Sequence, residues 1–392
     1  MESFDYKPKL NADNDRPSPN KGMKFFGCQW PFRQHGESGL WVSDLYPHVA
    51  RQADELCVLN GMHTDSPEHA AALEQYHTGS FLFARPSLGS WVVYGLGTQN
   101  QNLPAFVTIK PPMLLGGARY FSSAFLPSTY QGMPVGSPLE NLSRMKVPNL
   151  ANSRYSRAEQ RAILDFAQGQ NRELASRTAD PDPIEGVIES YELAFRMQTD
   201  LGDVLDVQRE PVATLDRYGI GSGKPTDDFG RQCLMARRLA ESGVRFIELC
   251  SDGWDHHGFV ARLMPQSSTQ VDRPIAALLM DLRERGMLDD TLLVWGGEFG
   301  RTPDDPRGDG RGHNPHGFTV WLAGGGVRGG LAHGKTDDYG YKAVEGRVHL
   351  HDLHATLLHL LGLDHTRLTY RYAGRDFRLT DVHGKVVQEI LA

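Results

Sequence analysis

Histidine is abundant in this chain and is concentrated in a few short segments. The 392 residues include 16 histidines. Four segments carry His, Asp or Glu beside glycine or proline: GMHTDSPEH, SDGWDHHG, GGEFGRTP and GRGHNPHG. Carboxylates supply charge and neutral imidazoles supply directional nitrogen atoms, and together they suit a divalent cation. These segments therefore predict a metal site, provided that the fold brings them together.

The candidate metal ligands follow from local spacing. Asp255 and His257 are two residues apart in WDHH, so both can point to one cation from an extended loop, supported by Asp252 or His256. Glu298 follows an apolar run and has glycines on both sides, where the backbone can approach a ligand closely. Each candidate has an ordinary alternative, which is a solvated loop, a helix cap or a surface histidine. The full set of candidate ligands is Asp255, His257, Glu298, His313 and His69.

The segment around Pro67 could carry the reacting group. It lies at the expected start of a helix, whose free amides favour an oxyanion, and the hydroxyl of Thr64 or Ser66 could be a nucleophile activated by a metal. The alternative is that Ser66 or Asp65 only caps the helix. Arg301 could hold an anionic substrate through a bidentate fork, or pair with a nearby aspartate instead. His316 is the remaining catalytic candidate, in the exposed loop that also holds His313.

Buried strands must position these residues. Apolar runs predict strands at 56–60, 244–250, 291–295 and 318–323. Apolar residues at helical spacing, with glycine at the expected C-terminal ends, predict helices at 67–83, 226–243 and 352–361 and a further helix that ends before Gly286. The strand, helix and strand from 244 to 295 predict a right-handed parallel crossover. Ligands in open α/β sheets bind beyond the carboxyl ends of the strands, which is where the candidate residues lie. The expected class is α/β with an open, mostly parallel sheet.

The expected organisation is one large domain with an arm and an insertion. Residues 1–40 are rich in Pro, Asn, Gly and charge, which predicts an extended N-terminal arm. Residues 41–392 form the α/β domain. Residues 104–148 hold so many prolines and glycines that we expect a long surface excursion without regular elements, which is either a lid over a site or a plain insertion. Residues 156–207 look helical, so the insertion covers about 100–225.

Composition excludes several classes of protein. The net charge of −7 gives no broad basic surface, so we expect no nucleic-acid partner. No apolar run approaches the roughly 20 residues that a spanning helix needs, so we expect no membrane partner. The four cysteines show no CxxC spacing and indicate neither a zinc ribbon nor a disulfide scaffold. The GGGVRG segment at 324–329 is not followed by a helical pattern, so a dinucleotide site is not supported.

The chain resembles the sulfatase-like family called domain of unknown function 1501, a branch of the alkaline phosphatase superfamily. The resemblance rests on MESFDYKP, RPSLGSWVVYGLG, GWDHH, GGEFGRTP, GHNPHGFTVWLAGGGVRGG and HDLHATLLHLLGLDH. It implies a three-layer α/β/α sandwich with a two-metal centre of zinc, calcium or magnesium. It also implies action on a small anionic ester, such as a sulfated or phosphorylated carbohydrate. The ligands it implies are Asp255, His257, Glu298 and His313.

Two departures from the family pattern matter. Sulfatases of the superfamily place a modifiable Cys in a CxPSR-like loop, whereas TDSPEH has none, so Thr64 or Ser66 would have to serve in place of formylglycine. Family members also begin with a strand ending in a GGPSHxDxFD-like segment, often after a twin-arginine signal. This chain opens inside that segment, with Glu2 in place of the expected Asp. As written it predicts a cytoplasmic protein, but the resemblance implies an exported, periplasmic one with an earlier start.

Two hypotheses of different classes remain. The first is a metal-dependent hydrolase of sulfate or phosphate esters, in which cations position the ester and generate or shield the nucleophile. The second is a non-catalytic binding or surface protein that keeps the fold with an incomplete metal site. Because function resides in the site and not in the fold, the choice depends on whether the candidate side chains meet.

Overall fold

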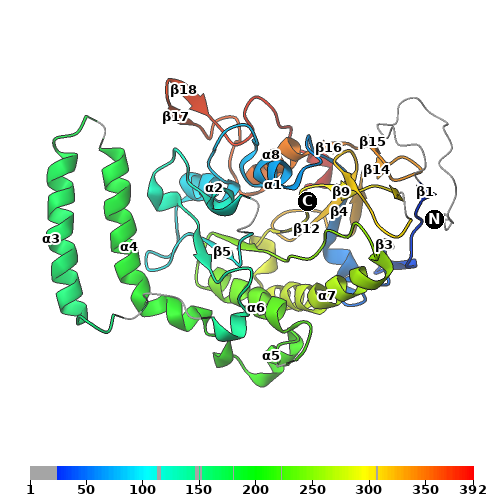
Figure 1. The fold of residues 1–392 in the computed structure, drawn as a ribbon, viewed down its shortest axis with the longest axis horizontal. Coiled ribbons are helices and arrows are strands. Elements are labelled where there is room, and N and C mark those ends of the chain that lie inside the picture. Colours follow the sequence, from blue (N-terminus) through cyan, green and yellow to red (C-terminus); the bar gives the residue numbers. More distant parts are fainter. Residues whose placement is uncertain are drawn as a thin grey trace.

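A five-stranded sheet is built around β4 (Leu56–His63). The computed structural model describes residues 24–112, 116–145, 150, 152–179, 181–221, 223–305 and 308–392. The strand order is β13 (Leu331–His333), β4, β12 (Phe318–Ala323) and β8 (Leu293–Trp295), and β16 (Val348–His349) also pairs with β4 (Figure 1). β13 and β16 run parallel to β4, whereas β12 runs antiparallel to both β4 and β8. The sheet is therefore mixed.

Helices pack against both faces of this sheet. Cys57 and Leu59 of β4 cluster with buried leucines of α8 (Leu350–Leu360). Leu56, on the opposite face of the strand, clusters with buried residues of α7 (Val260–Glu284). Alternate residues of a strand point to opposite faces, so α7 and α8 cover different sides of β4.

A second, fully parallel sheet has the order β6 (Met133–Val135), β5 (Phe106–Ile109) and β7 (Phe246–Leu249). Every residue of β5 is buried, as is typical of a central parallel strand. The prediction that 104–148 lacks regular elements is therefore wrong. Pro104 lies just before β5, and Pro134 lies inside β6. Among the described residues, β6 pairs only with β5, so the missing N–H of Pro134 is tolerated at this edge.

The expected parallel crossover from 244 to 295 is also wrong. Its first strand is β7, which pairs with β5, and its last strand is β8, which pairs with β12 in the other sheet. The loop between β8 and β12 brings the chain back beside β8, so the two strands pair antiparallel. An apolar run predicts a buried strand but does not identify its neighbour.

The predicted helices are present with shifted ends. The stretch 67–83 contains α1 (His69–Thr78), and the stretch at 226–243 contains α6 (Asp227–Glu241). Residues 156–207 form the hairpin of α3 (Arg157–Ala175) and α4 (Asp182–Leu205), at the left of Figure 1. None of the described helices combines the length and apolar composition needed to cross a bilayer.

The remaining elements are short. Part of the expected arm, residues 1–23 with Glu2, lies outside the described residues, and the rest of it includes the first strands. The remaining helices are α2 (Leu88–Leu96) and α5 (Val212–Arg217). The remaining strands are β1 (Lys24–Phe25), β2 (Phe32–His35), β3 (Leu40–Ser43), β9 (Gly300–Arg301), β10 (Asp304–Asp305), β11 (His313–Asn314), β14 (Lys335–Thr336), β15 (Ala343–Glu345), β17 (Tyr370–Tyr372) and β18 (Arg375–Phe377).

Candidate metal centre

Three side chains from distant parts of the chain meet in one cluster. His69, Asp255 and His313 each offer a ligand atom, and these atoms all lie within 4.8 Å of one another. His69 is the first residue of α1, Asp255 lies in the loop between β7 and α7, and His313 begins β11. All three were candidate ligands in the sequence. Their ligand role stays a prediction, but the geometry that it requires is present.

Local structure explains where His69 and His313 point. Glu68 caps α1 by accepting hydrogen bonds from the amides of Ala70 and Ala71, and this cap begins the helix at His69. The β9–β11 ladder pairs His313 with Arg301. Directly opposed residues in an antiparallel pair have neighbouring side chains, so the ladder holds His313 beside Arg301.

Asp255 is the centre of the cluster. Its Oδ1 accepts from Arg301 Nη1 at 2.5 Å and lies 3.1 Å from His257 Nε2 and 3.2 Å from His313 Nε2. Its Oδ2 lies 3.3 Å from His69 Nε2. Burial raises the pKa of Asp255, but the hydrogen bond and charge of Arg301, with help from His313 and His257, hold that pKa well below its usual range. Asp255 is therefore ionised at neutral pH.

The contacts of Nδ1 in His69 and His313 indicate which ring nitrogen carries the hydrogen. His69 Nδ1 lies 2.6 Å from Glu298 Oε1, and His313 Nδ1 lies 2.7 Å from the carbonyl oxygen of Pro67. Carboxylate and carbonyl oxygens accept hydrogen bonds, so the tautomer that fits these two contacts carries its hydrogen on Nδ1 and leaves Nε2 on the side of Asp255. His69 Nε2 faces Asp255 Oδ2, whereas His313 Nε2 lies near both Asp255 Oδ1 and His257 Nε2, the latter at 3.0 Å.

The inner nitrogens of the two rings and Asp255 form a set that could hold a cation. His69 Nε2 is buried and has no hydrogen-bond partner among the described residues. A nitrogen in this position beside a carboxylate suits either a bound cation or an N–H group that donates to Asp255. The Glu298–His69 contact is the arrangement by which a carboxylate orients a metal-binding imidazole. Glu298 therefore contacts the far nitrogen of a candidate ligand.

Phe299 is a residue of the site that the sequence did not reveal. Its buried ring lies 4.9 Å from the ring of His69 and 4.6 Å from the ring of His313, centroid to centroid. It packs against both imidazoles and limits their movement. Its place in GGEFGR was visible, but an aromatic side chain gives no chemical signal of this role.

Thr64 and Ser66 follow β4 and lie close to the histidine loop. The amide of Thr64 donates to the carbonyl of Pro315, and its hydroxyl donates to Gln75 Oε1 at 2.9 Å. Ser66 Oγ accepts from the amide of Glu68 at 3.1 Å, while Glu68 itself caps the helix. Both hydroxyls are largely buried. The simple capping role considered for Ser66 therefore belongs to Glu68.

The other two catalytic candidates have different outcomes. Arg301 reaches the cluster but pairs with Asp255, which is the alternative considered for it. His316 is exposed, and its backbone contacts Asn314 Oδ1 and the amide of Ala343. The structure does not place His316 among the three clustered ligand residues.

A second group of histidines lies beside Asp65. His349 Nε2 lies 3.2 Å from Asp65 Oδ1, and its Nδ1 accepts from the amide of His351. Gln75 donates to the other oxygen of Asp65, so Gln75 connects this pair with the hydroxyl of Thr64. Both nitrogens of His349 are occupied, which indicates that it holds the loop in place.

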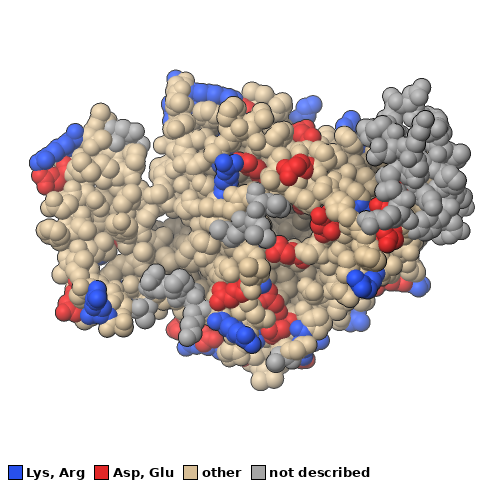
Figure 2. Space-filling view, viewed as in Figure 1, with Lys and Arg blue, Asp and Glu red and all other residues tan. Residues whose placement is uncertain are grey.

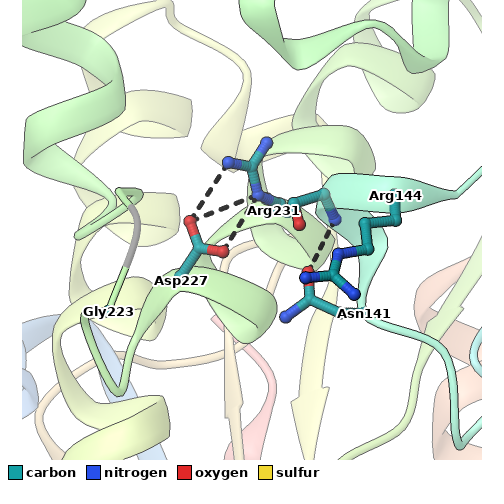
Figure 3. A pocket seen from close by; sticks show the side chains of 6 residues that line it. Asn141, Arg144, Gly223, Asp227 and Arg231 are labelled. Carbon is teal, nitrogen blue, oxygen red and sulfur yellow. Dashed lines mark hydrogen bonds and ion pairs between the residues drawn. The ribbon is translucent and has the colours of Figure 1, made fainter.

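A separate cavity of about 360 Å³ lies between the N-terminal end of α6 and residues 141–144. Figure 3 shows Arg231 directed toward Asp227 on the wall of this cavity. Arg231 Nη2 donates to Asp227 Oδ1 at 3.1 Å, so the guanidinium charge is already matched. The cavity shares no lining residue with the cluster.

Comparisons with known proteins identify a family but no reaction. The model of a family described as protein of unknown function (DUF1501) matches residues 1–391. No curated protein matches the chain in sequence. Among solved structures, a sulfatase from Pseudoalteromonas sp., PsFucS1, is 15% identical with a TM-score of 0.37, and the match covers 81% of this chain and 62% of the sulfatase chain. The chain thus spans less than two thirds of that protein, and a likeness this low carries no argument about chemistry.

Proposed function

Because the chain belongs to the DUF1501 family, whose function is unknown, we propose a function from the geometry of its site. The protein is a metal-dependent hydrolase of sulfate or phosphate esters that works without formylglycine. The observation that carries this proposal is the cluster of His69, Asp255 and His313, whose ligand atoms lie within 4.8 Å of one another. We also propose that the fold is the three-layer sandwich of the alkaline phosphatase superfamily.

His69 Nε2, Asp255 and His313 Nε2 would hold the cation, with His257 beside them. Two imidazoles and one carboxylate suit zinc better than calcium or magnesium, which prefer oxygen ligands. A bound divalent ion would polarise the ester and lower the pKa of a coordinated hydroxyl. Glu298 would keep His69 oriented, and Phe299 would keep both rings in place.

Ser66 is the preferred nucleophile. Thr64 commits its proton to Gln75, whereas Ser66 Oγ accepts from the amide of Glu68, which leaves its own proton available for transfer. Ser66 also precedes Pro67, whose carbonyl contacts the candidate ligand His313. Thr64 remains the second choice. Arg301 would turn from Asp255 to the sulfate or phosphate group when an ion neutralises Asp255.

The proposed substrate is a small anionic ester, such as a sulfated or phosphorylated carbohydrate. Figure 2 shows basic and acidic side chains interspersed on one face of the molecule, without a continuous basic surface there. This distribution supports a small substrate over a nucleic acid.

Metal analysis of the purified protein, followed by assays on aryl sulfate and aryl phosphate, tests the proposal. We expect about one equivalent or more of a transition metal and turnover of one ester class. Asp255→Asn should lose both the metal and the turnover, whereas the exposed control His359→Ala should keep both. A metal-free wild-type protein with no turnover after zinc addition would remove the hydrolase proposal.

The ion pair of Arg301 with Asp255 favours a second candidate, a non-catalytic protein of this fold. Without a metal, the guanidinium already neutralises the carboxylate. This candidate predicts an intact fold and no metal binding in calorimetry at any zinc concentration that keeps the protein soluble. Measured zinc binding that Asp255→Asn abolishes would exclude it.

A further inference from the structure

Five histidines contact one another in a row beside the first turns of α8. The ring centroid of His349 lies 5.0 Å from that of His63 and 5.0 Å from that of His351. The ring of His351 lies 5.1 Å from that of His383 and 6.4 Å from that of His354, centroid to centroid. We call these five residues the histidine row. The row joins the end of β4 and the C-terminal segment of the chain to α8.

The C-terminal segment crosses the row as a strap, which we define as residues 382–387. His383 supplies the outermost ring of the row, and this ring stacks on its neighbour at an interplanar angle of 22°. The amide of Lys385 donates to Asp352 Oδ1 at 2.7 Å, and the amide of Val387 donates to Thr356 Oγ1 at 3.0 Å. Through these contacts the strap packs on the first turns of α8.

The strap is fixed at both ends and loosely packed between them. Before it, Asp381 forms an ion pair with Arg85 at 3.0 Å, and after it, Ile390 is fully buried. A cavity of about 300 Å³ lies between residues 382–385 and the N-terminal end of α8. Val382 is 72% exposed. The middle of the strap can therefore lift while both ends stay in place.

Burial opposes a positive charge at the centre of the row. His351 is 6% exposed, and its Nδ1 has no hydrogen-bond partner among the described residues. Burial, with smaller effects of His349 and His383, lowers the pKa of His351 to about 4. Burial also lowers the pKa of His63 to about 4, with His349 adding to the effect. A proton on either ring is therefore unfavourable while the strap is packed.

The groups around the row do not offset this effect. Asp352 accepts from backbone amides at both of its oxygens. Asp65 accepts from Gln75 and contacts Nε2 of His349. Both acids raise the pKa of His351, but by less than burial lowers it. The titratable and charged groups that face the row from β4, α1, β16, α8 and the strap are Asp65, His77, Arg347, Asp352 and Lys385.

We propose that the strap is a pH-sensitive closure. It packs on α8 while the histidine row is uncharged, and it lifts when the row takes up protons, because lifting gives the protonated rings access to water and separates like charges. The contact of His349 with Asp65 carries the change to the loop 64–66, which holds the proposed nucleophile. Only this role of the loop rests on the proposed function, whereas the lifting of the strap does not.

Hydrogen exchange measured by mass spectrometry at about pH 7.5 and about pH 5.5 tests the closure. A histidine with a lowered folded pKa binds its proton first in the open state, so the equilibrium constant for lifting should rise by up to about tenfold per pH unit below about 6.5. We therefore expect the amides of Lys385 and Val387 to lose about tenfold in protection between the two pH values, after correction for the intrinsic exchange rate. Low urea concentrations should leave this exchange unchanged, since local lifting exposes little surface.

Variants assign the effect to the histidine row. His351→Gln should remove most of the pH dependence, because the buried ring no longer titrates. His383→Gln changes only the strap and should reduce the pH dependence while α8 stays intact. His359→Gln is the matched control, since His359 is an exposed histidine of α8 outside the row, and it should behave like the wild type. Exchange of the segment 63–68 should follow that of the strap in the wild type but not in His351→Gln.

Three results would overturn the proposal. The first is equal corrected protection of the strap at both pH values. The second is strap exchange that depends on urea as steeply as the exchange of β5, because the strap then opens only when the whole protein unfolds. The third is a pH dependence that both His351→Gln and His383→Gln leave unchanged. A segment 63–68 that stays protected while the strap lifts would remove the link to the loop.

Discussion

Two imidazole rings of the cluster are held by their outer nitrogens. Glu298 accepts from His69, and the Pro67 carbonyl accepts from His313, so both inner nitrogens face the carboxylate of Asp255. Arg301 keeps this carboxylate ionised by lowering its pKa, against the effect of burial. At the scale of single residues, these contacts give the side chains the orientation and charge that the proposed cation would need.

The first prediction concerns the carboxylate behind His69. Glu298→Gln should weaken zinc binding about 10- to 100-fold, because it removes the charge that orients and strengthens the ligand. Competition with a chromophoric chelator measures this change. Glu345→Gln is the control, since Glu345 is exposed and pairs with Lys335 in a surface ladder. An unchanged zinc affinity in Glu298→Gln would show that the carboxylate has no such role.

The second prediction separates the two hydroxyls. Ser66→Ala should lower turnover on the order of 10³-fold or more while zinc stays bound, because it removes the proposed nucleophile. Thr64→Val should keep most of the turnover, since its hydroxyl only donates to Gln75. Single-turnover kinetics on the aryl ester measure both. The opposite order of effects would make Thr64 the nucleophile.

At the scale of elements, the ends of strands and helices bring the cluster together. The segment with His69 follows β4, the loop with Asp255 follows β7, and the loop with Glu298 follows β8. The β9–β11 ladder then places His313 beside Arg301. Four short connections, each beginning at a rigid element, therefore fix the side chains more closely than one long loop could.

The third prediction concerns the cap of α1. Glu68→Ala should lower the free energy of unfolding by about 1 kcal/mol, because it removes the side chain that accepts from Ala70 and Ala71. It should also weaken zinc binding, since His69 is the first residue of the helix. Urea unfolding and zinc titration measure the two effects. Glu68→Asp should preserve both, as aspartate is a preferred cap, and equal losses in both variants would contradict the prediction.

At the scale of the whole molecule, two sheets and their helices bury polar groups that respond to pH. Burial lowers the pKa of His351 to about 4 and that of His354 to about 3, with neighbouring histidines adding to the effect. His354 Nε2 lies 2.8 Å from the carbonyl oxygen of Tyr76, which connects α8 with α1. These rings are neutral in the folded protein throughout the range in which they titrate in the unfolded chain.

The fourth prediction follows from this difference. A histidine whose folded pKa lies below its unfolded value, about 6.5, binds its proton first in the unfolded state. The free energy of unfolding is therefore greatest above pH 6.5 and falls as the pH decreases from 6.5 toward 4, by up to about 1.4 kcal/mol per pH unit for each histidine. Urea unfolding across this range measures the slope. His354→Gln should make the slope shallower, and an unchanged slope would contradict this assignment.

The sequence by itself determined many of the helices and strands and the residue types that are available for chemistry at the site. Apolar runs and periodicity predicted β4, β12, α6 and α8 closely, because those patterns follow from burial on one or two faces of an element. The segments after the strands indicated Asp255 and His313 as candidate metal ligands, because carboxylate and imidazole near glycine suit metal binding. The residues involved are visible without any coordinates.

Only the tertiary structure decided how these parts meet. Strand neighbours depend on long-range pairing, so the sequence misplaced β7 and β8 in one crossover and missed β5 between its prolines. The outer contacts of His69 and His313 also come from residues far along the chain, Glu298 and Pro67. The orientation of each ring depends on partners that are close in space but distant in the sequence, and no local spacing encodes such partners. For this reason the sequence named the candidate ligands, and the fold decided which of their nitrogens face Asp255.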